Sequence, residues 1–430
     1  MQFEKNCDIV IPLMAIVIPF KGVRYNTGKV KDPARVLAPP YDIISQKQKE
    51  ELYELSPYNI VQIDFGKVLE TDTESENRYT RASHLLNDWM KSGVLIRDEH
   101  PCFYCYEITY TLRGKELKFR GLMGLVGLEP FESGVVLPHE ETRSKPKADR
   151  LNLMRSTKAN ISPIFSLYSS KRKIASSILN SVTITSEPVI EGTDSMGGIH
   201  RLWRIDDEAD MHAISGEMQD LKIFIADGHH RYETALEYMR EMKDKDSTGG
   251  SGYVMMFLAN MEDSGLSVLP TYRLIKKVPS DMIDRLKKRF NMESVTMTAD
   301  SLNFLDDLTK REGHCFGVYS GGGSGFVFRA ESGAFADMNM PSPPLGSLDV
   351  IVLHRLILEK ILDVNEFSYE MSAAEAIKMV DSGEFEAAFF LKATRLHELK
   401  NVALDGKRMP PKSTYFFPKL MTGMVLNLLD

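Results

Sequence analysis

The sequence predicts an α+β protein with mixed sheets and packed helices. Apolar residues recur at helical spacing in several segments, for example residues 74–92 and residues 231–242. Between residues 102 and 129 apolar side chains occupy alternate positions, which is typical of paired strands. Because helices and strands are intermixed without strict alternation, we do not expect a purely parallel sheet.

The N-terminal part is expected to contain one strand and two helices. Residues 8–20 are apolar but too short to cross a bilayer, and no cleavage site follows them, so we expect a first strand. After the rigid Ala38-Pro39-Pro40-Tyr41-Asp42 turn, residues 45–55 have the cap and spacing of a helix. A second helix is expected over residues 74–92, with Gly93 placed to end it.

Residues 102–129 are expected to form a hairpin around Gly114. Cys102-Phe103-Tyr104-Cys105 has the spacing of a redox motif, but it lies inside the first strand of this hairpin and not at a helix start. We therefore interpret both cysteines as strand residues. Further along, residues 321–325 are glycine-rich, lack the spacing of a dinucleotide fingerprint, and predict a hairpin loop.

The C-terminal part is expected to contain two helices and a strand. The helices are predicted over residues 348–362 and 373–382, and the strand over residues 387–392. Residues 409–419 are neither helical nor regularly strand-like, although they are too aromatic for a disordered tail.

Composition limits the classes of function. The chain has 430 residues and a formal net charge of −7, so its overall field repels nucleic acid. Four scattered cysteines do not form a disulfide framework and indicate a reducing compartment, by default the cytoplasm. We expect three sub-structures, over residues 14–128, 129–332 and 333–430, the last with a tail that can fold back on the site.

The segment Asp227-Gly228-His229-His230-Arg231 is the strongest candidate site. Residues 221–226 predict a strand and residues 231–242 a helix, so Asp227-Gly228 forms a tight turn at the helix start. Unpaired backbone amides and the positive end of the helix dipole attract anions there. His229, His230 and Arg231 add donors that suit phosphate, and Asp227 can orient a histidine. The alternative is an exposed helix start without a ligand.

A second candidate is Pro138-His139-Glu140-Glu141-Thr142-Arg143 with the cations that follow it. Arg143, Lys145, Lys147, Arg150, Arg155 and Lys158 face only Asp149 among acids, which predicts a positive patch. An ionised Glu140 in such a patch can accept a proton from a substrate hydroxyl. A solvated loop with internally paired charges remains the alternative.

A third candidate is Lys412-Ser413-Thr414, whose ammonium and hydroxyls can contact phosphate. Pro411 stands where a Walker A loop needs glycine, so this segment is not such a loop. A packed segment with Lys412 in a salt bridge is the competing interpretation.

Several motifs together resemble the domain-of-unknown-function family 1015. They include Pro39-Pro40-Tyr41-Asp42, Pro57-Tyr58-Asn59, Pro138-His139-Glu140, Asp149-Arg150-Leu151, the segment from Asp227 to Ala235, and Pro411-Lys412-Ser413-Thr414-Tyr415-Phe416. The resemblance runs from about Met14 to the C-terminus, which implies that residues 1–13 are an extension. One departure is Tyr272, where the family usually has histidine, although Arg273 still supplies a cation.

The turn at Asp227 is also similar to the phosphate-binding turn of the ParB and sulfiredoxin superfamily, which includes free-serine kinases. This resemblance implies a ParB/sulfiredoxin-like core, with His230 and Arg231 on nucleotide phosphates. It implies a phosphotransferase that uses ATP or ADP with Mg²⁺ and a small hydroxylated metabolite, for example free serine.

In that hypothesis Asp227, His230 and Glu140 are catalytic. The phosphates are held by Gly228, His229, Arg231, Lys147, Arg150, Arg273, Lys412, Ser413 and Thr414. The alternatives are a nucleotide-binding regulatory module without a metabolite substrate and, last, a metal-dependent hydrolase using His139, Glu140, His229 and His230. No zinc-type ligand spacing supports the hydrolase, and neither nucleic acid nor membrane is an expected partner.

Overall fold

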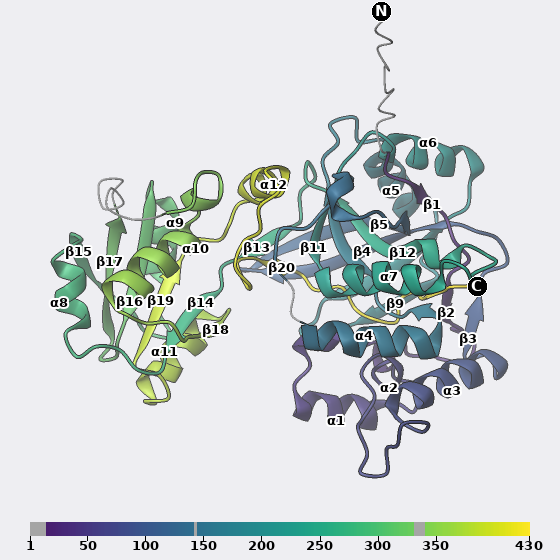
Figure 1. Cartoon of the computed structure of the whole chain (residues 1–430), viewed down its shortest axis with the longest axis horizontal. Coiled ribbons are helices and arrows are strands. Elements are labelled where there is room, and N and C mark those ends of the chain that lie inside the picture. Colours follow the sequence, from purple (N-terminus) through teal and green to yellow (C-terminus); the bar gives the residue numbers. More distant parts are fainter. Residues whose placement is uncertain (1–13, 142–143, 331–339) are drawn as a thin grey trace, which may run out of the picture. The chain divides into compact units, whose positions relative to one another are not determined.

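The computed structural model describes residues 14–141, 144–330 and 340–430 (Figure 1). The chain divides into two compact units. Unit 1 contains the chain up to Pro138, residues 142–266 and residues 418–430, and unit 2 contains residues 139–141 and 267–417. Within the described ranges, every helix is too short or too polar to cross a membrane.

Unit 1 is built on a mixed sheet of nine strands. The strands follow the order β6-β11-β8-β12-β5-β4-β10-β9, and β1 pairs with β5. β11 runs parallel to β6 and β12 parallel to β8, while the other neighbours are antiparallel. The strands are β1 (Val17–Ile18), β4 (Phe103–Leu112), β5 (Lys115–Gly127), β6 (Val136–Leu137), β8 (Ile164–Tyr168), β9 (Ile190–Thr193), β10 (Ile199–Ile205), β11 (Ile223–Asp227) and β12 (Tyr253–Asn260).

Seven α-helices of unit 1 accompany this sheet among the described residues. Figure 1 shows α4 between α7 and the helices α1 to α3, and α4 packs against both α7 and α3. The seven helices are α1 (Gln46–Leu55), α2 (Val61–Asp64), α3 (Arg78–Lys91), α4 (Ser144–Thr157), α5 (Ile174–Thr185), α6 (Glu208–Met218) and α7 (His229–Met242). Two short strand pairs complete the unit: β2 (Val23–Tyr25) with β3 (Leu95–Arg97), and β7 (Ala159–Asn160) with β21 (Asn427–Leu428).

The main core of unit 1 lies between one face of the sheet and helices α4 to α7. Leu179 of α5, Met218 of α6 and Tyr232 of α7 join strand residues such as Cys105 and Met256 in a single buried cluster. Each large apolar side chain buried in this way contributes roughly 1.5–3 kcal/mol to stability. The alternating strand residues point to the opposite face, where the rings of Tyr106, Phe119, Phe165 and Phe257 pack on one another.

The predicted hairpin is confirmed. β4 and β5 pair from Tyr104–Met123 to Leu112–Lys115, and the turn residues Arg113 and Gly114 have φ of 51° and 74°. Two positive φ angles match the twist of the strands in a two-residue hairpin. Burial raises the pKa of Cys105 inside β4 and of Cys102 directly before it, as expected for structural cysteines.

The predicted N-terminal helices are found, with one shifted start. The Ser45 hydroxyl accepts a hydrogen bond from the Gln48 amide and caps α1 as expected. The second helix begins at Arg78 and not near residue 74, because the Asn77 side chain forms a capping box with Thr80.

Unit 2 contains a six-stranded antiparallel sheet in the order β15-β17-β16-β19-β14-β18. The strands are β14 (Tyr272–Ile275), β15 (Met292–Thr296), β16 (His314–Tyr319), β17 (Ser324–Ala330), β18 (Ser368–Glu370) and β19 (Ala387–Leu391). The helices are α8 (Met282–Lys287), α9 (Asn303–Lys310), α10 (Asp349–Ile351), α11 (Ala373–Asp381) and α12 (Leu396–Leu404). α10 continues as a π-helix over Val352–Ile361, so the helix predicted over residues 348–362 exists with a wider turn.

The segment 409–419 is more regular than its sequence suggested. Tyr415–Phe417 forms β20, which pairs with β13 (Ser267–Leu269) in unit 2. The expectation of no regular strand was therefore wrong for these three residues, whose pairing partner lies far away in the sequence.

Residues 418–430 form what we call the C-terminal strap of unit 1. Thr422 pairs with Ala38, and Leu426 pairs with Val23. The strap therefore brings side chains from the end of the sequence next to the first hundred residues, as the prediction of a returning tail allowed.

Candidate anion-binding site

The start of α7 follows a tight glycine turn. β11 ends at Asp227, and Gly228 follows with φ 97° and ψ 26°, after which the helix begins at His229. Gly228 has no side chain that could cap the first turn, and the positive end of the helix dipole favours an anion there. The predicted strand, tight turn and helix are confirmed.

Arg231 in this first turn has an incomplete set of hydrogen bonds. One terminal nitrogen, Nη1, donates to the Pro163 carbonyl and lies 3.4 Å from the Ser162 hydroxyl. Its Nε is buried and has no hydrogen-bond partner. The carboxylate of Asp227 is 3.9 Å from Nη2, too far for a short charge-assisted bond.

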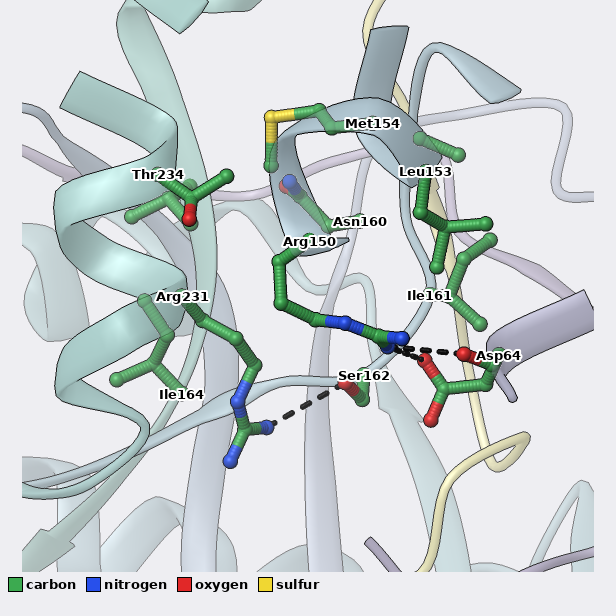
Figure 2. Close-up of a pocket in the computed structure, with 12 residues that line it drawn as sticks. Asp64, Arg150, Leu153, Met154, Asn160, Ile161, Ser162, Ile164, Arg231 and Thr234 are labelled. Atoms are coloured by element: carbon green, nitrogen blue, oxygen red, sulfur yellow. Dashed lines mark hydrogen bonds and ion pairs between the residues drawn. The ribbon is translucent and has the colours of Figure 1, made fainter. Parts of the chain in front are cut away.

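A small cavity lies beside this guanidinium. Figure 2 shows Arg150 from α4 and Arg231 from α7 reaching into it, with Ser162 between them and Asp64 opposite. Its volume of about 40 Å³ has room for a few water molecules or the oxygen atoms of an anion. Burial raises the pKa of Asp64, although Arg150 and Arg231 act in the opposite direction.

A second cavity on the Arg231 side chain is lined by the C-terminal strap. Lys419 and Thr422 of the strap contribute to its wall with Asp227, and the Lys419 ammonium is 2.6 Å from Asp227 Oδ2. Thr422 is only 1% exposed, yet its hydroxyl has no hydrogen-bond partner. Four buried side-chain atoms of the described residues lack a partner, and two of them, Arg231 Nε and Thr422 Oγ1, belong to residues that line this cavity.

Three cations of the predicted positive patch pair with acids in the structure. Arg150 bonds to Asp64 at 3.0 Å and to Asp149 at 2.5 Å. Lys147 bonds to Glu233 at 2.8 Å. Arg155 likewise pairs with Glu241 of α7. Sequence spacing missed these acids because they come from α2 and α7, and the prediction of a patch facing Asp149 alone was wrong. Arg143 and the side chain of Lys145 lie outside the described part of the chain.

The two histidines of the motif differ in environment. His229 is buried, whereas His230 is half-buried. Burial lowers the pKa of His230, helped by Lys147 and Arg231 and opposed by Glu233 and Asp42. At neutral pH His230 is therefore an uncharged donor or acceptor at the helix start.

The remaining predicted site residues belong to unit 2. His139 is fully buried, and its Nε2 lies 3.1 Å from the Thr414 hydroxyl. The backbone of Glu140 pairs with Met409, two residues before the Pro411-Lys412-Ser413-Thr414 segment. The Ser413 hydroxyl donates to the Pro410 carbonyl at 2.7 Å. Unit 2 thus brings the second and third sequence motifs together.

Arg273 is buried in unit 2 without a carboxylate partner in the described part of the chain. Its Nε donates to His354 Nε2 at 2.9 Å, and other nitrogens donate to the carbonyls of Thr271 and Lys412. Burial lowers the pKa of Arg273 to about 10, and burial with nearby Arg273 lowers that of His354 to about 3. The Lys412 ammonium makes no ion pair with any residue that the structure describes, contrary to the salt bridge that was the competing interpretation.

Sequence reasoning missed Asp64, Ser162, Lys419 and Thr422. Asp64 follows a recognisable Pro57-Tyr58-Asn59 motif, but nothing local links it to Arg150. The other three have no local signal, because they reach Arg231 only through sheet topology and the strap.

Comparison with known proteins identifies the family. A family model described as a protein of unknown function, DUF1015, matches residues 17–351. The chain belongs to the DUF1015 family. The motifs quoted from the sequence had predicted this membership. No curated protein matches the chain.

Solved structures similar to this DUF1015 protein are distant. Free serine kinase in complex with AMP is 14% identical, with 67% of this chain and 89% of that chain covered and a TM-score of 0.33. A conserved hypothetical protein from Pyrococcus furiosus is 16% identical, with 68% and 92% covered and a TM-score of 0.33. SbnI with a C-terminal truncation, from Staphylococcus aureus, is 9% identical, with 71% and 87% covered and a TM-score of 0.34. At these values the likeness does not establish a shared activity.

Proposed function

We propose that this protein is a phosphotransferase that moves a phosphoryl group between a nucleotide and the hydroxyl of a small metabolite, for example a free amino acid such as serine. The proposal rests on one observation: two buried side-chain atoms without a partner, Arg231 Nε and Thr422 Oγ1, belong to residues that line the cavity beside Asp227. Buried polar atoms without partners are costly, and an oxygen-rich anion satisfies both. The proposal includes a ParB/sulfiredoxin-like core.

Arg231 is the cation that we assign to the phosphate. Arg150 and Lys147 already hold carboxylates at hydrogen-bond distance, whereas the nearest carboxylate oxygen of Asp227 is 3.9 Å from Arg231. A charge-assisted hydrogen bond to phosphate contributes about 1.5–3 kcal/mol. Arg150 then positions Asp64 at the cavity wall and contributes long-range charge. The enclosed space suits phosphate oxygens, so the nucleoside lies outside it.

The transfer step assigns a role to each class of predicted site residue. The acceptor hydroxyl gives its proton to a carboxylate, the role that the sequence hypothesis gives to Glu140, while its oxygen bonds to the terminal phosphorus. The bond from that phosphorus to the bridging oxygen breaks, and the leaving nucleotide keeps the electron pair. Gly228 amides, His229, His230 and Arg231 hold the phosphates, and Asp227 orients the first turn.

Mg²⁺ belongs to this proposal as part of the nucleotide. The described residues contain no group of three or more His, Cys, Asp or Glu side chains that could hold a metal ion. Magnesium is commonly held by substrate phosphates with one or two carboxylates, so a complete protein cage is not required. This also leaves the metal-dependent hydrolase without support from the described residues.

Phosphorus NMR tests the activity directly. The protein is incubated with ATP or ADP, Mg²⁺ and pooled amino acids and sugars, and a new phosphomonoester resonance is expected. Arg231→Gln is expected to abolish the product signal, whereas Arg155→Gln, which removes an exposed ion pair with Glu241, leaves it unchanged.

The outcome also separates the two classes of function. Nucleotide consumption that requires the acceptor supports the phosphotransferase. Nucleotide that binds but is not consumed, whatever acceptor is offered, contradicts it and favours the regulatory module. In that case Glu140→Gln has no effect on nucleotide binding or turnover.

A further inference from the structure

A buried chain of hydrogen bonds reaches the C-terminal strap from the opposite face of the sheet. Asp194, in the turn between β9 and β10, lies 3.0 Å from His200 Nε2. His200 Nδ1 lies 2.7 Å from the Tyr106 hydroxyl on β4. That hydroxyl accepts a hydrogen bond of 3.0 Å from the amide of Met421, in the strap. Four groups from three separate parts of the chain are joined in series.

The donors and acceptors of this chain fit one arrangement. The Met421 amide can only donate, so the Tyr106 oxygen accepts and its own proton points to His200 Nδ1. His200 then carries its proton on Nε2 and donates it to Asp194. Asp194 is itself held by the amides of Met196 and Gly198, both 2.8 Å from its Oδ1. Tyr106 and His200 are completely buried, so the two bonds of the Tyr106 hydroxyl are shielded from water, whereas the Asp194 side chain is 19% exposed.

We propose that the Tyr106–His200–Asp194 relay is a positioning device that holds the strap at Met421, and thereby presents Lys419 and Thr422 to Arg231. Met421 lies between Leu420 and Thr422, which line the second cavity together with Lys419. Thr422 is fixed on its other side by two backbone bonds to Ala38, of 2.8 and 3.2 Å. The inference deepens the proposed function, on which its consequence for phosphate binding rests.

Tyr106→Phe tests the relay, because it removes one hydroxyl and keeps the buried ring. Hydrogen exchange of the backbone amides of residues 418–423, measured by mass spectrometry, is expected to become about tenfold faster. The reason is that the Met421 amide loses its hydrogen bond to the Tyr106 hydroxyl. Tyr110→Phe is the matched control: Tyr110 is four residues along β4, buried, and its hydroxyl donates to Gly265. Unchanged exchange of residues 418–423 in Tyr106→Phe would overturn the proposal.

His200 provides a test that a purely packing role does not pass. His200→Asn keeps an acceptor near the position of Nδ1 and is expected to retain slow exchange in the strap. His200→Leu removes it and is expected to behave like Tyr106→Phe. Equal exchange in the two variants contradicts the relay.

Binding of inorganic phosphate, measured by calorimetry, separates this inference from the proposed function. Weaker phosphate binding in Tyr106→Phe, by a factor similar to the gain in exchange rate, supports the whole inference. Faster amide exchange in the strap with unchanged phosphate affinity would show that the relay does not affect the anion site. That result would overturn the proposal that the relay positions Lys419 and Thr422 near Arg231. A wild-type protein that binds no phosphate contradicts the proposed function, and the exchange data still decide whether the relay holds the strap.

Discussion

Gly228→Ala is the substitution whose effect on the site can be worked out most directly. Gly228 has a φ of 97°, which side-chain-bearing residues avoid. The left-handed conformation costs an alanine about 1–2 kcal/mol. Its lower entropy in the unfolded chain returns about 0.4–1 kcal/mol. The backbone alone therefore predicts a net loss of about 1 kcal/mol of unfolding free energy.

The added methyl group has a second, local effect. A Cβ atom at Gly228 would lie 2.9 Å from Arg231 Nε and 3.0 Å from Arg231 Cζ, closer than normal contact distance. The guanidinium must therefore move away from its present position beside the cavity. Loss of one charge-assisted bond of about 1.5–3 kcal/mol predicts a phosphate or ADP affinity that is about 10-fold to 150-fold weaker.

Gly249→Ala is the control for the backbone penalty. Gly249 has a φ of 76°, and nothing lies within 4 Å of an added Cβ. Stability is followed by tryptophan fluorescence during urea unfolding, because Trp89 and Trp203 both report on unit 1. Ligand affinity is measured by calorimetry. We expect the two variants to lose similar amounts of stability, and only Gly228→Ala to bind phosphate or ADP more weakly. Wild-type affinity in Gly228→Ala, or equal loss of affinity in both variants, would falsify the assignment of Arg231 to the anion.

Three further predictions follow from buried groups. Thr422→Val removes a hydroxyl without a partner, so we expect unchanged or slightly higher stability in urea unfolding but weaker phosphate binding. The control is Thr157→Val, which removes a hydrogen bond of 2.8 Å to a backbone carbonyl and costs about 1 kcal/mol of unfolding free energy. The pKa of His354 is lowered to about 3, below its value in the unfolded chain. Wild-type stability is therefore lost as pH falls from about 6.5 toward 3, by up to about 1.4 kcal/mol per pH unit. His354→Gln keeps an acceptor for Arg273 and should flatten this pH dependence in calorimetric melts. Burial lowers the pKa of His230, so acidification below neutral pH adds a positive charge at the helix start and should strengthen sulfate binding in the wild type but not in His230→Gln. A loss of stability in Thr422→Val would contradict the assignment of an unpartnered hydroxyl to Thr422. An unchanged pH slope in His354→Gln would contradict the assignment of the pH dependence to His354. Equal pH profiles of sulfate binding in the wild type and His230→Gln would contradict the role of His230.

Local signals in the sequence predicted the local structure well. The hairpin around Gly114 and the cap at Ser45 depend on residues within a few positions of one another, and both are found. The helix α4 was not predicted, because only one side of its last two turns, with Leu151 and Met154, enters the core cluster. β20 was missed since its pairing partner β13 is more than a hundred residues away.

The candidate site shows the same division. The turn at Gly228 and the first turn of α7 were predicted from a strand, a glycine and a helix in direct succession. The charges around Arg150 were misjudged, since its partner Asp64 is distant in the sequence and no spacing rule connects them. Lys419 and Thr422 reach the site only because the strap pairs with residues near the N-terminus.

The two arginines beside the cavity illustrate how a fold separates structural from binding groups. Arg150 is 6% exposed, holds two carboxylates and stacks on Tyr41 at 3.9 Å, so its bonding capacity is used within the protein. Arg231 lines the same cavity and has an unpartnered nitrogen, in the first turn of α7. Removing one partner of a buried ion pair costs several kcal/mol of stability, so the carboxylates hold Arg150 in place. A ligand would instead give Arg231 the hydrogen bond that its Nε lacks. We infer that Arg150 fixes the shape of the cavity and that Arg231 binds the anion.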